Sequence, residues 1–201
     1  MAGLTYSTAE FNTIITMLGC MCATVQAATG WYAGYYKKKK ALLKTNEVLS
    51  RSHRTFGAFA TLLYFLGLFA GTVGFFGGIF FNEPPFEITS ISYNFHVWPS
   101  FIVFGIIVTK TISSYFRKPF IYKNCKWLGV ATFIAWSYTW ITSAISYFLR
   151  TLPENLQHEP PTYLLPFNLL WLQILIPFLL GALFGAGILK YSLKSGRQNS
   201  N

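Results

Sequence analysis

The chain has 201 residues, of which 53% are hydrophobic and only 11% are charged, and its formal net charge is +10. An average globular domain is about a quarter charged, so this chain lacks the polar surface that a water-soluble enzyme needs. Its basic residues lie in short runs between long apolar stretches, not on one face of a soluble domain, which argues against nucleic-acid binding.

Apolar stretches long enough to cross a bilayer, roughly 20 residues each, occur five times. In chain order they cover residues 11–36, 55–81, 96–115, 127–149 and 163–189. Because no long polar segment remains between them, the sequence predicts a single all-α membrane domain over residues 1–201. The expected partners are the lipid bilayer and other membrane protein subunits.

The charges of the connecting segments are strongly asymmetric. Counting Lys110 near the end of the third stretch with the segment that follows it, all of the 16 basic residues except Arg150 fall between the first and second stretches, between the third and fourth, or after the fifth. The other two connectors hold four acidic residues: Glu83, Glu87, Glu154 and Glu159. By the positive-inside rule, this pattern predicts an N-terminus outside and a C-terminus in the cytoplasm or its equivalent.

Glycine pairs with a spacing of four residues occur in two predicted helices, at Gly67 and Gly71 and at Gly181 and Gly185. Such pairs let two backbones, or a backbone and a flat ring, approach closely. Packing of helix against helix is the commoner use of this spacing in membrane proteins, and it is the interpretation favoured here.

Acidic residues are missing from the apolar stretches, since the chain has no Asp and its Glu residues lie in loops or near helix ends. Ion-coupled transporters usually place an ionisable group at mid-membrane depth, so a small transporter is the weakest hypothesis. The sequence also lacks a Ser/His/Asp arrangement or an HExxH motif typical of hydrolases. Any chemistry is therefore expected to be electron transfer.

The histidines are the remaining candidates for chemistry. His53 lies before the second stretch on the basic side, and His96 begins the third stretch on the other side. Ligands of one metal ion lie about 2 Å from it, whereas most of a ~30 Å hydrocarbon core separates these two residues. They therefore mark two separate sites. The third histidine, His158, lies in a polar loop and is expected to be solvated.

A repeated pattern precedes the second and fourth stretches, His-Arg-Thr-Phe-Gly at 53–57 and Cys-Lys-Trp-Leu-Gly at 125–129. A glycine one turn after a ligand leaves room for a porphyrin edge, and a neighbouring base can meet a propionate. If the second and fourth helices lie diagonally opposite in the bundle, His53 and Cys125 would lie at the same depth in the membrane. The alternative is that both segments are ordinary basic signals at a membrane edge. The pattern nominates the possible ligands His53 and Cys125, the bases Arg54 and Lys126, and the glycines Gly57 and Gly129.

Four motifs carry a resemblance to a known family: the Gly-Trp-Tyr-Ala-Gly-Tyr-Tyr run at 30–36, the Ser-His-Arg entry at 52–54 with Gly57, His96, and the Lys-Trp-Leu-Gly entry at 126–129. Over residues 11–149 the chain resembles cyanobacterial membrane proteins of unknown function that are distantly related to the ascorbate-reducible cytochrome b family. The resemblance implies a four-helix cytochrome-b-like core followed by a fifth C-terminal transmembrane helix. It also implies a bacterial plasma or thylakoid membrane.

In such cytochromes, paired histidines hold a haem b near each membrane face, one pair from helices one and three and the other from helices two and four. The resemblance matches His53 to the inner ligand of helix two and His96 to the outer ligand of helix three. Cys125 stands where the partner histidine of His53 would be, and Asn12 stands where the partner histidine of His96 would be. Each site thus keeps half of its ligands, and of the two substitutes only Cys is a usual haem ligand, as thiolate.

Three classes of function remain open. The first is a redox protein with one haem b near the inner face, held by His53 with Cys125 or with an open sixth position. Chlorophyll is a variant of this class, because its magnesium needs only one histidine. The second is a structural or assembly subunit that kept the scaffold and binds no cofactor. The third is a small transporter.

Overall fold

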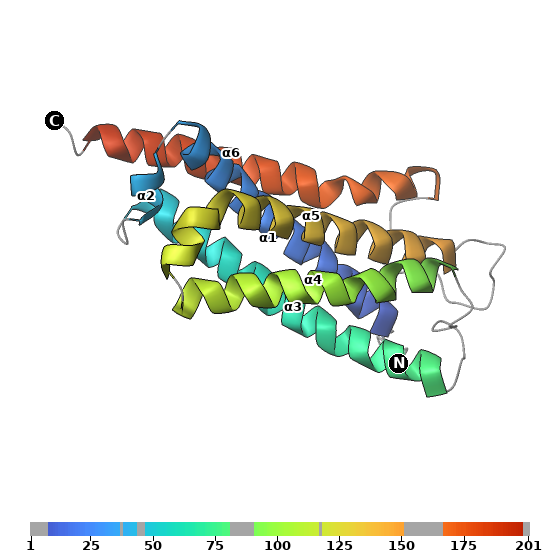
Figure 1. Ribbon diagram of the computed structural model, residues 1–201. Helices are drawn as coiled ribbons and strands as arrows, with labels where there is room; N and C mark the ends of the chain where they lie inside the picture. Colours follow the sequence, from blue (N-terminus) through green and yellow to red (C-terminus); the bar gives the residue numbers. More distant parts are fainter. Residues whose placement is uncertain are drawn as a thin grey trace, which may run out of the picture.

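The computed structural model describes residues 8–36, 38–43, 47–80, 91–116, 118–150 and 167–198. Every secondary-structure element in these ranges is helical (Figure 1). In chain order the elements are α1 (Thr8–Tyr35), α2 (Lys39–Leu43), α3 (Val48–Phe80), α4 (Ile91–Phe116), α5 (Lys118–Arg150), the 3-10 helix η2 (Phe167–Ile174) and α6 (Ile176–Gln198).

Within the described ranges, five helical segments are long and apolar enough to cross a membrane, which confirms the predicted number of spans. Two helices start well before their apolar stretches, α3 at Val48 and α5 at Lys118. The predicted starts were set by hydropathy, which is low in a segment that contains charged residues. Lys and Arg are nevertheless good helix formers, so both helices begin within the basic flanks. The segments are Glu10–Tyr35, Val48–Gly77, Ile91–Phe116, Lys123–Phe148 and Trp171–Ser195.

The fifth stretch is not one uninterrupted helix. The 3-10 helix η2 ends at Ile174, and the Leu175 N–H donates to the Leu172 carbonyl at 2.9 Å before α6 begins. Pro177 lies in the first turn of α6, where its missing N–H costs no ladder hydrogen bond. The proline therefore marks the start of the α-helical part of this span.

The long helices alternate in direction, and α1 lies between α3, α5 and α6, while α4 packs on α5 (Figure 1). One end of the bundle therefore holds the last turns of α1, α4 and α6 and the first turns of α3 and α5. We call it the basic end, because Arg54, Lys126 and Lys190 lie near it. The other end is called the opposite end.

Trp136 of α5 is the centre of the main core. Its indole meets the Tyr64 ring edge-on, with ring centroids 5.8 Å apart, and lies over Gly19 of α1. The core joins four helices, α1, α3, α4 and α5, whereas α6 packs outside it against α1. Its buried residues are Cys22, Ala23, Ala60, Tyr64, Val103, Ile107, Ala135 and Trp136.

The glycine pairs serve mainly for packing helix against helix. A Cβ atom at Gly181 would lie 2.7 Å from the Met21 carbonyl oxygen, so α6 approaches the backbone of α1 directly. A Cβ atom at Gly67 would lie 3.2 Å from Oδ1 of Asn12, also on α1. Gly71, in contrast, has no atom within 4 Å of that position. The favoured interpretation is therefore correct for Gly67 and Gly181 and not for Gly71.

Candidate functional site

His53 lies in the second turn of α3 and is turned onto α1. Its Nδ1 is 2.9 Å from Oγ1 of Thr29, and the imidazole also hydrogen-bonds to the backbone of Gln26. Gly30 allows this approach, because a Cβ atom there would lie 3.2 Å from Cε1 of the ring. These contacts fix the orientation of the imidazole, so a metal bound by His53 would have to be bound through Nε2.

Gln26 occupies the space that the sequence assigned to a porphyrin edge. A Cβ atom at Gly57 would lie 2.2 Å from Nε2 of Gln26, so the glycine makes room for this amide. The other end of the amide, Oε1, accepts a hydrogen bond of 2.8 Å from Nζ of Lys110. Gly57 is therefore a packing position for a polar side chain of α1, which corrects the expected open notch.

Lys110 is a site residue that the sequence analysis missed, since it was counted only with the basic flank after the third stretch. The structure places its side chain toward the bundle interior, half-buried and bonded to Gln26. Val103 and Ile107 are buried on the same face of α4, at helical spacings of seven and three residues before it. That spacing was the available signal, because it puts a lysine in line with two core residues.

Cys125 and Gly129 lie on the face of α5 that is buried further along, at Thr132 and Trp136. At the basic end this face is uncovered: Cys125 is exposed, and a Cβ atom at Gly129 would meet nothing within 4 Å. The structure does not bring His53 and Cys125 into contact, because the imidazole is turned onto α1.

The levels of the two residues along the bundle can be compared by counting from a contact between α1 and α5. Gly19 of α1 contacts Trp136 of α5, and the two helices run in opposite directions. Equal steps along both helices bring Gly30 level with Cys125. Gly30 also contacts the His53 ring, so this count of equal steps puts His53 and Cys125 at similar levels along the bundle.

His96 lies near the opposite end and ties α4 to α5. Its Nδ1 is 2.9 Å from Oγ1 of Thr142, and the neighbouring Phe95 carbonyl accepts a hydrogen bond from the Tyr138 hydroxyl. Asn12, its nominal partner, packs instead against Gly67 of α3. His96 and Asn12 therefore lie against different neighbours, His96 against Thr142 and Asn12 against Gly67.

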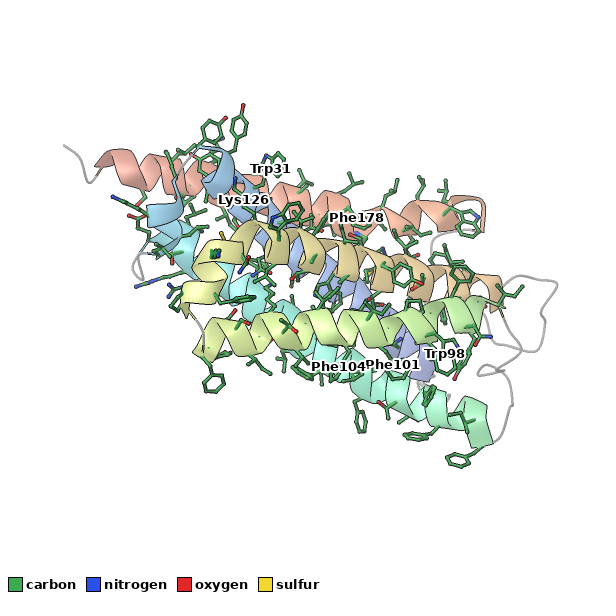
Figure 2. All side chains as sticks on the ribbon, in the orientation of Figure 1. Trp31, Trp98, Phe101, Phe104, Lys126 and Phe178 are labelled. Carbon is green, nitrogen blue, oxygen red and sulfur yellow. The ribbon has the colours of Figure 1, made fainter. Side chains whose placement is uncertain are left out.

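The two bases of the repeated pattern, Arg54 and Lys126, are both exposed, and Figure 2 shows Lys126 near the basic end of α5. In the described ranges, no group of three or more His, Cys, Asp or Glu is placed to hold a metal ion. His158 and the acids of the two acidic connectors lie outside the described residues.

Comparison of the chain with protein-family models, with curated proteins and with solved structures finds no match.

Proposed function

We propose that this membrane protein binds one haem b near the basic end through His53 and serves electron transfer. The observation that carries the proposal is the imidazole held by Thr29 at the depth where Cys125 and Gly129 leave the inward face of α5 uncovered. Histidine ligands of metals commonly have one ring nitrogen held by such a hydrogen bond while the other binds the metal.

The donor set at this end fits a one-histidine site. Cys125 is the second residue at this depth with a metal-binding side chain, and a thiolate is a known haem ligand. Gln26 fills the space at Gly57 with the far end of a flexible side chain, so a haem edge there would require this amide to rotate and its hydrogen bond from Lys110 to break. His53 would hold the iron, and Arg54 and Lys126 would meet propionates near the membrane edge.

A haem supplies one-electron chemistry at its iron, and the protein supplies the ligand, the orientation and the surrounding charge. Here α1 orients the ligand through Thr29 and Gln26, and Lys110 adds a positive charge near it. A fixed positive charge near the iron favours the ferrous state over the ferric state electrostatically. The site is thus suited to accept an electron.

A subunit without cofactor is the second candidate, and the position of Gln26 favours it. With its amide in the Gly57 notch and bonded to Lys110, the interior between α1, α3 and α4 is closed by protein side chains alone. In that case the cluster would only hold helices together inside a membrane complex. Chlorophyll, which also needs a single histidine, is the pigment variant of the first candidate.

Spectra of detergent-purified protein separate these candidates. We expect a Soret band that shifts on reduction for haem, a red band for chlorophyll, and no visible colour for the cofactor-free subunit. Replacing Cys125 by His supplies the second histidine at the same depth, so the reduced spectrum should change to that of a low-spin bis-histidine haem. Cys125→Ser is the matched control, and identical spectra of the His and Ser variants would contradict the proposed site.

We further propose that the basic end faces the cytoplasm or its equivalent, as the charge asymmetry predicts. Cys125 is exposed at this end, whereas Cys20 and Cys22 are buried. A membrane-impermeant maleimide should therefore label the protein only after the cells are opened, and Cys125→Ser should remove that labelling. Labelling of Cys125 in sealed cells would reverse the proposed orientation.

A further inference from the structure

Lys110 carries a positive charge into the bundle without a described carboxylate partner. Its Nζ donates to the neutral amide oxygen of Gln26 at 2.8 Å. Of the acids that the structure describes, Glu10 lies at the opposite end, and Glu47 precedes α3. Glu47 is about 15 Å from Gly57 along α3 at the helical rise of ~1.5 Å per residue. The charge of Lys110 is therefore not balanced locally by the described chain.

The side chains described near Lys110 are either positively charged or neutral hydrogen-bond donors. His53 and Arg54 lie on α3, and Lys110 and Arg54 both act electrostatically on the imidazole. The Nε2 donor of Gln26 lies in the notch at Gly57, beside the same cluster. A charge in a medium of low dielectric constant is costly without a counter-ion, so an anion supplied from outside the chain would stabilise this arrangement.

The depth of Lys110 matches the head-group boundary of a bilayer. It lies about 9 Å from the end of α4, using ~1.5 Å per residue. The 26 residues of α4 span about 39 Å against a hydrocarbon core of ~30 Å, so Lys110 lies within reach of the phosphate level. On the opposite, outward face of the same turns of α4, Ile112, Tyr115 and Phe116 are exposed.

We propose that Lys110, held in place by Gln26, binds the phosphate group of an anionic phospholipid at the basic end of the bundle. Basic pockets between transmembrane helices on the cytoplasmic side are suited to such head groups. This inference does not depend on haem, and it applies equally to a protein without cofactor.

Native mass spectrometry of the full chain in mild detergent tests the site with phosphatidylglycerol and phosphatidylcholine as probes. The wild-type protein should retain phosphatidylglycerol in preference to phosphatidylcholine. Lys110→Gln should lower the bound phosphatidylglycerol about fivefold, the effect expected of one lysine near a membrane surface. Lys190→Gln, which removes an exposed lysine near the same end, is the matched control and should leave binding unchanged.

Two further variants separate loss of binding from loss of folding. Gln26→Glu gives Lys110 an internal carboxylate, so it should lower lipid binding without lowering thermal stability. Lys110→Arg should retain binding, because it keeps the charge. Equal phosphatidylglycerol binding by the wild type, Lys110→Gln and Gln26→Glu would overturn the proposal. Complete displacement of phosphatidylglycerol by millimolar inorganic phosphate would overturn the lipid head group as the ligand.

Discussion

Gly19→Ala is expected to destabilise the bundle by about 1–3 kcal/mol, the usual cost of overpacking a core. A Cβ atom at Gly19 would lie 2.1 Å from Cη2 of Trp136. The indole is only 1% exposed and is enclosed by Tyr64 and its neighbours, so it has little room to move. The midpoint of thermal unfolding in detergent, followed by circular dichroism, measures this effect.

Gly34 on the same helix provides the control, because no atom lies within 4 Å of its Cβ position. Gly34→Ala should leave the midpoint unchanged or raise it slightly, since alanine is the better helix former. The Gly19→Ala loss should shrink when Trp136 is replaced by the smaller Phe, so the two substitutions should be non-additive. Equal midpoints for Gly19→Ala and Gly34→Ala would show that α1 and α5 do not pack as described.

His53→Ala is expected to reduce the haem content of the purified protein to near zero, because alanine offers no lone pair to the iron. The fold should persist, since the substitution removes a hydrogen bond to Thr29 worth about 1 kcal/mol and little core packing. Haem absorbance per mole of protein, with helicity measured on the same samples, gives the result.

His96→Ala is the matched control for this prediction. His96 bonds to Thr142 at the opposite end of the bundle. Its replacement should therefore leave the haem content unchanged. If His96→Ala lost haem while His53→Ala retained it, the site would lie at the opposite end, and the assignment to His53 would be wrong.

Hydropathy alone was sufficient to predict the five spans, because a bilayer requires each crossing segment to be long, apolar and internally hydrogen-bonded. The helix starts were less well predicted, since the charged flanks at Val48 and Lys118 are also helical. The break before α6 lies directly before Pro177, and a proline inside an apolar stretch is the sequence signal for such an interruption.

The candidate site was predicted only in part. His53 and Cys125 stay proposed ligands, and the sequence did not show that the His53 ring would lie against Thr29 of α1. The direction of each side chain depends on how α3 and α5 rotate against α1, and this rotation is set by tertiary contacts outside either motif. The sequence therefore did not reveal that Gln26 would fill the space at Gly57 or that Lys110 would point inward to meet it.

The haem-to-protein ratio of wild-type protein purified from haem-replete cells tests the central claim most directly. The proposal places a single haem at the one histidine of the basic end, so the ratio should approach one haem per chain. A pyridine haemochrome assay combined with quantitative amino-acid analysis measures it. Colourless wild-type protein with intact helicity would contradict the haem proposal and leave the cofactor-free subunit as the function of this bundle.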